Sequence, residues 1–271
     1  MTFEDNVRHQ RLRRTTGLGR SAYSQRTRLF GAAVVVVTAV AAYSWLTRSS
    51  DEWSTTIANV SRIEVDIAAG DIELFGSSGS DVQLDAHTDD GWVRAARLEH
   101  HIDGETLRIE GRCSGNRFVP GFGCGTHVVL AVPDGVEVKA ATSGGSIEST
   151  GLVGNVNLES SAGDVVIEGH SGELRAHSTA GDVTAMGLTS HAAYLTSSAG
   201  SVEVQAVSPP RSLDVESSGG PVHVELPAGH AYHVEASGVD GEATVDAATN
   251  FTSGYEVRAF SSADTATVTT R

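Results

Sequence analysis

The chain is poor in aromatic residues and in positive charge. Of its 271 residues only 6% are Phe, Trp or Tyr, two are Cys and one is Lys, whereas 30 are Gly. Few aromatic side chains beside abundant Gly, Ser, Thr and Val predict a thin, regular β structure rather than a thick globular core. Residues 49–271 hold 11 Lys or Arg against 32 Asp or Glu. Such an acidic body excludes nucleic-acid binding and the capture of acidic polysaccharide in a basic groove.

Catalytic motifs are also missing from the sequence. It contains no Gly-x-Ser-x-Gly elbow, no His-Glu-x-x-His helix and no phosphate-binding loop. We therefore expect no catalytic activity and no cofactor. A glycan-active enzyme that uses two opposed carboxylates stays open as an alternative, because 32 acidic residues provide many candidate pairs.

One apolar run, at residues 29–46, contains no charged residue. Eighteen residues in a helix span about 27 Å, which is enough to cross a bilayer core, so we expect a transmembrane helix there. The preceding segment, 1–28, is rich in Arg, and the positive-inside rule makes it a basic cytoplasmic tail with residues 49–271 outside. This predicts a single-pass protein of the cell membrane. The alternative is a signal peptide cleaved after Ala39-Val40-Ala41.

The predicted extracytoplasmic part repeats a turn of two Ser or Thr residues, a small residue, Gly, and then Asp, Ser or Pro. Ser160-Ser161-Ala162-Gly163-Asp164 is one copy. Successive turns lie 18 to 21 residues apart, and alternating apolar residues flank each of them. Two short strands and two turns per repeat predict one coil of a parallel β-solenoid. An antiparallel sandwich is the alternative. The turn residues are Gly70, Asp71, Gly145, Gly163, Asp164, Gly181, Asp182, Gly200 and Gly220.

These patterns predict an all-β chain with a single solenoid domain behind one transmembrane helix. We expect a linker at 47–61 and the solenoid at 62–260, irregular to about residue 135 and regular over 136–246. The strand at 255–260 is expected to close the stack. Residues 261–271 are expected to form a polar C-terminal tail.

The repeats, the opening Val65–Leu74 pattern and the strand that ends in Val132-Pro133-Asp134-Gly135 resemble the bacterial putative-adhesin family of β-strand repeat proteins. The resemblance covers about residues 60–250 and implies a membrane-anchored, solenoid-like surface domain of unknown function. Relatives also occur in envelope-stress proteins. The family has no established set of functional residues, so none is implied here.

Cys113 and Cys124 bracket a Gly-rich loop between two expected strands. Outside the cytoplasm we expect them to form a structural disulfide. The His residues fall at different positions of the repeat, which predicts scattered surface residues rather than a metal site. Asp71, Asp164 and Asp182 share one turn position; we expect them to cap turns, with Ca²⁺ binding between coils as the alternative.

The paired Ser and Thr hydroxyls are expected to satisfy the turn backbone, and sugar binding is their alternative. The sequence thus predicts a binding or adhesion module whose partner is a cell-envelope protein or glycan. The second hypothesis is an envelope-stress or regulatory accessory protein that acts through a membrane partner.

Overall fold

The computed structural model describes residues 50–90, 94–115 and 124–271. The chain divides into the units Met1–Thr47 and Arg48–Arg271, and the described residues all belong to the second. The predicted cytoplasmic tail at 1–28 and transmembrane helix at 29–46 lie outside the described residues. Within the described ranges, no helix has the length and apolar character needed to cross a membrane.

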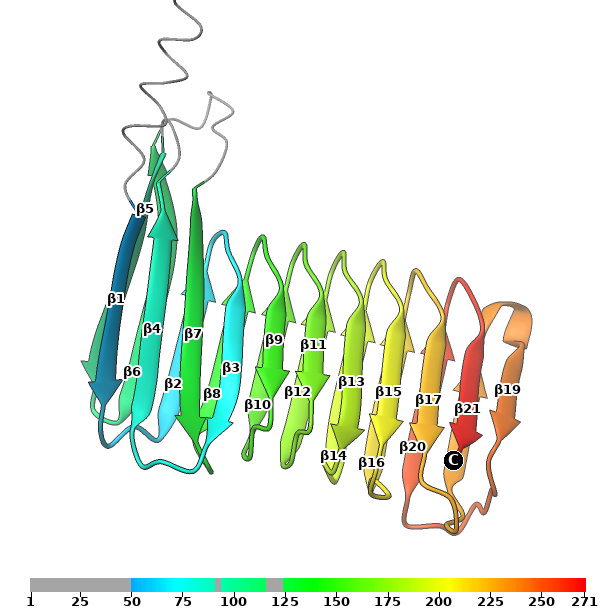
Figure 1. Ribbon diagram of the computed structural model, residues 1–271. Helices are drawn as coiled ribbons and strands as arrows, with labels where there is room; N and C mark the ends of the chain where they lie inside the picture. The colour runs from blue at the N-terminus through cyan, green and yellow to red at the C-terminus, as the bar shows by residue number, and fades with distance from the viewer. Residues whose placement is uncertain (1–49, 91–93, 116–123) are drawn as a thin grey trace, which may run out of the picture. The chain divides into compact units, whose positions relative to one another are not determined.

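The described residues form two β-sheets, which we name sheet A and sheet B (Figure 1). Sheet A contains eleven described strands in the spatial order β1 (Ser50–Ile57), β4 (Val82–Asp89), β7 (Gly125–Pro133), β3 (Ile72–Ser77), β9 (Ile147–Thr150), β11 (Val165–Glu168), β13 (Val183–Leu188), β15 (Val202–Ala206), β17 (Val222–Leu226), β21 (Ala266–Thr270) and β19 (Ala243–Asp246). Sheet B contains ten in the order β18 (His233–Ser237), β20 (Glu256–Ser261), β16 (Ser212–Ser217), β14 (Ala192–Ser197), β12 (Glu173–Ser178), β10 (Val156–Ser160), β8 (Glu137–Thr142), β2 (Arg62–Ile67), β6 (Thr106–Gly115) and β5 (Arg94–Asp103). One 3₁₀ turn, η1 (Val239–Gly241), follows β18.

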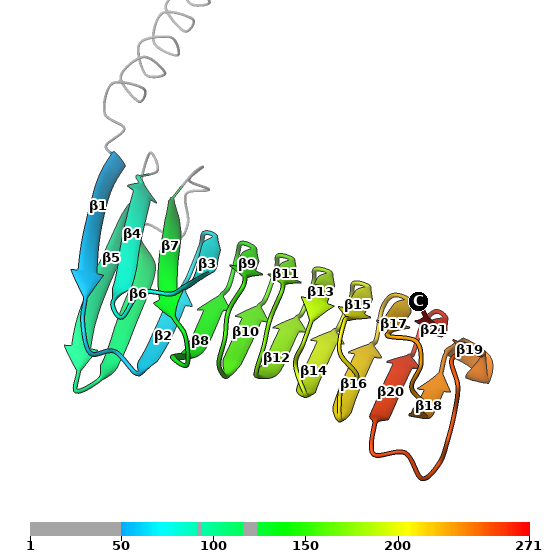
Figure 2. The same ribbon diagram turned by 60° about the horizontal axis from the view of Figure 1, so that its bottom comes forward.

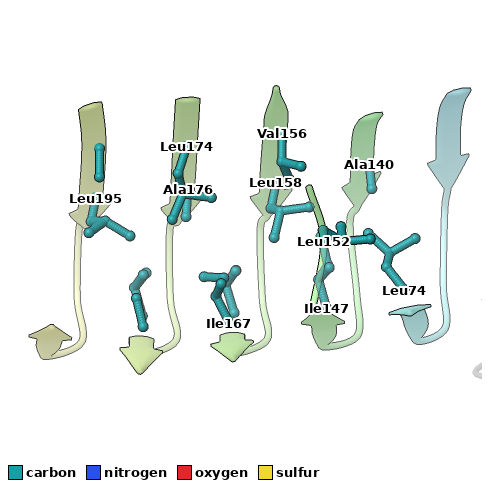
Figure 3. Packing of buried hydrophobic residues seen from close by; sticks show 14 of the residues in the cluster. Leu74, Ala140, Ile147, Leu152, Val156, Leu158, Ile167, Leu174, Ala176 and Leu195 are labelled. Atoms are coloured by element: carbon teal, nitrogen blue, oxygen red, sulfur yellow. The ribbon is translucent and has the colours of Figure 1, made fainter. Parts of the chain in front are cut away.

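Each coil contributes one strand to each sheet, and successive coils stack in parallel register (Figures 1 and 2). Leu158 pairs with Ala176, and Ala176 pairs with Leu195, so large and small side chains alternate along the core. Figure 3 shows these side chains pointing into the space between the sheets. All three are at most 1% exposed. Burial of a Leu side chain contributes about 1.5–3 kcal/mol, so stacking is what stabilises a coil that could not fold alone.

The parallel solenoid is confirmed for the repeats. The Asp182 backbone N–H donates to Asp164 Oδ1 at 2.8 Å, as expected when equivalent turns lie one coil apart. The antiparallel sandwich is wrong for these residues. Among the described strands, antiparallel pairing is confined to the N-terminal end of the stack, where β4 pairs with β1 and β7, and β5 pairs with β6.

The N-terminal end is more regular than predicted in one respect. β2 and β3 form a coil that stacks directly on β8 and β9, with Ile72 paired to Ile147. The later segments β6 and β7 pair with the other side of that coil. The predicted linker at 47–61 also needs correction, because β1 pairs along its whole length with β4.

At the C-terminal end, too, the coils do not stack in the order of the sequence. β20 and β21 form a coil that lies between β16/β17 and β18/β19. Ala266 and Val268 are fully buried, so β21, which lies within the expected polar tail at 261–271, instead contributes to the core. The strand at 255–260 does not close the stack, because β18 and β19 lie outside it.

Candidate functional site

The predicted turn residues form one continuous row along the stack, in which the backbone of each turn lies against the backbone of the turn in the neighbouring coil. A Cβ on Gly145, Gly163, Gly181, Gly200 or Gly220 would collide with the backbone of the equivalent glycine one coil earlier. Gly70 has a φ of +138°, and a Cβ there would collide with the backbone of Thr126. The repeated glycines are therefore required by the close approach of the turns.

The first Ser of each pair stabilises the same turns. Ser178 Oγ donates to Gly163 O in the previous coil at 2.8 Å and accepts from the Gly181 N–H at 2.9 Å. Thr142, Ser160, Ser197, Ser217 and Ser261 make the equivalent bond to the carbonyl of a neighbouring coil. These side chains are at most 5% exposed. Their hydroxyls are buried and used by the backbone, which supports the structural interpretation over sugar binding.

The shared Asp position caps turns across coils. Asp71 Oδ1 accepts from the Ser146 N–H at 2.8 Å, and Asp182 Oδ1 accepts from the Ser201 N–H at 2.6 Å. At the next equivalent position stands Pro221, which has no N–H to cap. In the part of the chain that the structure describes, no group of three or more His, Cys, Asp or Glu is arranged to hold a metal ion.

The predicted disulfide between Cys113 and Cys124 is present. It connects the end of β6 in sheet B with the residue before β7 in sheet A, and the two Cα atoms lie 6.1 Å apart. The bond therefore joins the two sheets at the N-terminal end of the stack.

The outer faces of the two sheets differ in charge. The strands of sheet A contain no Lys or Arg, and acidic residues such as Glu73, Glu148 and Glu203 lie on them. The Lys and Arg residues of the described strands all lie in sheet B. The acidic body predicted from composition is thus acidic on one face and mixed in charge on the other.

Four of the eight Lys and Arg residues in the described strands of sheet B fall in one row, which we call the central row. Parallel register places one outward residue of each strand beside the next, about 4.8 Å away. From β6 to β18 the central row reads Arg108, Glu64, Lys139, Asn157, Arg175, Tyr194, Asp214, Arg258 and Glu235.

Most cations near this row have a carboxylate partner. Arg175 Nη2 lies 2.6 Å from Glu173 Oε1, and Arg108 Nε lies 3.5 Å from Glu64 Oε2. Exposed pairs of this kind contribute at most about 1 kcal/mol, so a ligand can replace them at little cost. Lys139 differs from these residues, because it makes no ion pair or side-chain hydrogen bond with any described residue.

Two hollows meet at Lys139. One, of about 380 Å³, is lined by residues that include Glu64, Arg108 and Glu159. The other, of about 230 Å³, is lined by residues that include Asn157 and Arg175. Both are open to solvent on sheet B and share Lys139, so they adjoin across β6, β2, β8, β10 and β12; we call the two hollows together the groove.

Further along the central row, burial raises the pKa of two side chains. Burial raises the pKa of Asp214, and the Arg258 guanidinium partly opposes that change. Burial and the carboxylates of Glu216 and Asp214 raise the pKa of Tyr194. The Tyr194 residue is 43% exposed and can contact a ligand.

Sequence reasoning missed the central row. The signal was available, since Lys139 and Arg175 occur in the strand before the repeated turn, whereas the strands after the turns contain no Lys or Arg. Because one strand type builds sheet B and the other builds sheet A, counting charge by strand type would have separated the two faces.

Comparisons with known proteins give distant structural matches and one family match. Similar solved structures include a putative adhesin from Bacteroides fragilis, with 14% identity and a TM-score of 0.45, covering 82% of this chain and 97% of that one. A putative cell adhesion protein from Clostridium sporogenes has 11% identity and a TM-score of 0.40, covering 82% of this chain and 100% of that one. A putative lipid binding protein from Parabacteroides distasonis has 15% identity and a TM-score of 0.42, covering 82% of this chain and 94% of that one. No curated protein matches the chain. A family model described as Toastrack DUF4097 matches residues 60–270, so this chain belongs to that family, as the repeats predicted.

Proposed function

We propose that the chain is a membrane-anchored, extracytoplasmic binding module without catalytic activity, and that it binds an envelope glycan through the groove on sheet B. The observation that carries the proposal is the groove centred on Lys139. The Lys139 ammonium group is exposed and makes no ion pair or side-chain hydrogen bond with a described residue.

The groove suits an extended polymer because it crosses several strands along the stacking direction. An amide, an ammonium and a guanidinium group occur at Asn157, Lys139 and Arg175, and these groups donate hydrogen bonds to hydroxyl and carboxylate oxygens. Repeat solenoids commonly bind along such extended surfaces.

The charges in the groove limit the class of glycan. Glu64, Asp66, Glu110 and Glu159 line it beside the cations, so a polyanion would be repelled. A hydroxyl-rich strand with few carboxylates, such as a cell-wall glycan, fits the mixed lining better.

Binding to purified wall sacculi would test this proposal. The full-length chain would be mixed with intact sacculi, and the bound fraction measured by co-sedimentation. Loss of a charge-assisted hydrogen bond costs about 1.5–3 kcal/mol, so we expect Lys139→Gln to weaken binding tenfold or more. Arg211→Gln is the matched control, because Arg211 is exposed and lies outside the strands. This substitution removes one positive charge, as Lys139→Gln does. Equal binding by the two variants, or none by the parent chain, would contradict the proposal.

The membrane anchor requires a separate test. The apolar run at 29–46 and the Arg-rich segment before it support retention in the membrane with the N-terminus inside. A chain carrying an N-terminal tag should be recovered at full length in the membrane fraction. A mature chain that begins after Ala41 would show that the segment is a cleaved signal instead. In-cell crosslinking to one stoichiometric membrane protein would favour the regulatory alternative over glycan binding.

A further inference from the structure

The C-terminal end of the described stack exposes the end of the hydrophobic core. β19 follows β21 in register, with Val245 beside Val268 and Ala243 beside Ala266. Val268 and Ala266 are fully buried, whereas Val245 is 40% exposed and all four residues of β19 are exposed. The inward side of this last coil therefore has no further coil against it among the described residues (Figure 1).

The N-terminal end of the stack has longer edge strands, and side chains on them contact each other across the two sheets. β1 and β5, the outermost described strands there, are eight and ten residues long and pair antiparallel with their neighbours. Trp53 on β1 stacks on His100 of β5 with ring centroids 5.0 Å apart, and Trp53 also packs against the core. This contact between the two edge strands covers the core at the N-terminal end.

The last coil also has a distinct charge. Residues 227–255 contain no Lys or Arg; Glu242 and Asp246 lie exposed on them, whereas the Glu235 carboxylate lies 3.3 Å from Arg258 Nε of β20. Two further apolar residues, Val239 and Phe251, are exposed in the same segment, at 42% and 84%. The edge strand β19 therefore presents two apolar positions, Ala243 and Val245, beside an acidic rim formed by Glu242 and Asp246.

We propose that this end binds an extended segment of a partner polypeptide as a further strand beside β19. Among the described strands β19 pairs only with β21, so its other edge offers backbone groups that no described strand uses. Apolar residues at alternate positions of the added strand would cover Val245, and flanking Lys or Arg would meet Glu242 and Asp246. A second copy of this chain fits less well, because it would bring two acidic rims together.

A synthetic probe peptide, KVTVTVK, tests the proposal without knowledge of the natural partner. Fluorescence anisotropy would compare its binding to the full-length chain with that of EVTVTVE and of the proline-interrupted KVTPTVK. We expect KVTVTVK to bind at least tenfold more tightly than either, because EVTVTVE is repelled by the acidic rim and proline removes a backbone donor. Equal binding of the three peptides, or no binding of KVTVTVK, overturns the proposal.

Two matched variants locate the site. Val245→Lys should weaken KVTVTVK binding at least tenfold, since it replaces the apolar contact with a like charge. Val207→Lys is the control, because Val207 is 42% exposed but lies outside β19. Both positions are partly exposed, so both variants should fold, and circular dichroism would verify this. Equal weakening by both variants, or a parent dimer that only Val245→Lys dissociates, would overturn the proposal.

Discussion

The His170 side chain gives the sharpest test of how the core is built. It is 0% exposed, and neither ring nitrogen has a hydrogen-bond partner in the described chain. Leu occupies the equivalent corner in the coils on either side, since the backbone carbonyls of Leu152, His170 and Leu188 each accept the same bond from the following coil. Leu152 and Leu188 are each 2% exposed.

Replacing His170 by Leu should therefore stabilise the protein. An unpaired buried polar group costs about 1–3 kcal/mol, and a Leu in this corner would contact Leu on both sides. We expect His170→Leu to gain about 1–3 kcal/mol at pH 7.5. For a domain of this size each kcal/mol raises Tm by about 2–4 °C.

The gain should increase in acid. Burial lowers the pKa of His170 below its ordinary value near 6.5. The unfolded chain thus takes up a proton near pH 6.5 and the folded chain only at lower pH. Stability of the parent protein is lost as the pH falls through this interval. His170→Leu should remove that loss.

Thermal unfolding followed by circular dichroism between pH 5 and 8 would measure both effects. His223→Leu serves as the control, because His223 is exposed on sheet A and should change stability by less than about 0.5 kcal/mol. A His170→Leu protein that is no more stable than the parent, or that keeps the parent's pH dependence, would refute the reasoning.

Three further predictions concern the stack. Ser178→Ala should lower the free energy of unfolding by about 2–3 kcal/mol in urea titrations, because the Ser178 hydroxyl makes two hydrogen bonds. Ser149→Ala should raise it by about 1 kcal/mol, because the buried Ser149 hydroxyl makes none. Changes of the same sign in both variants would contradict this. Reduction of the Cys113–Cys124 bond should cost about 3 kcal/mol by the loop-entropy account, measured as a lower Tm in dithiothreitol, and a Cys113→Ser/Cys124→Ser protein should show no such response. Val268→Ala should cost about 2 kcal/mol in the same titrations, because Val268 is fully buried; a neutral effect would restore the polar-tail interpretation.

Local features were predictable from the sequence. The turn around Gly163 recurs with the same small residues because each coil approaches its neighbour closely at that point. Alternation of apolar residues places Leu158 and Ile167 inside, since side chains alternate between the faces of a strand. The cysteine pairing followed from the predicted compartment and the short separation.

Long-range order was not predictable in the same way. Nothing local in the strand at Arg62–Ile67 specifies that it lies between β6 and β8, because any coil with the same alternation offers a similar surface. The central row was missed for a related reason. Lys139 and Arg175 lie 36 residues apart in the sequence, and only the parallel register places them two strands apart in space.

The out-of-sequence coil at the C-terminal end has a consequence for how the protein is made. During synthesis or export, the segment that forms β18 and β19 emerges before the segment that forms β20 and β21. Yet β20 and β21 occupy the position directly beside β16 and β17. The coil of β18 and β19 therefore cannot take its place in the stack until the residues of β20 and β21 have also emerged. A fragment that ends before Glu256 would lack the coil on which β18 and β19 stack, so assembly of this end depends on residues that are synthesised after it.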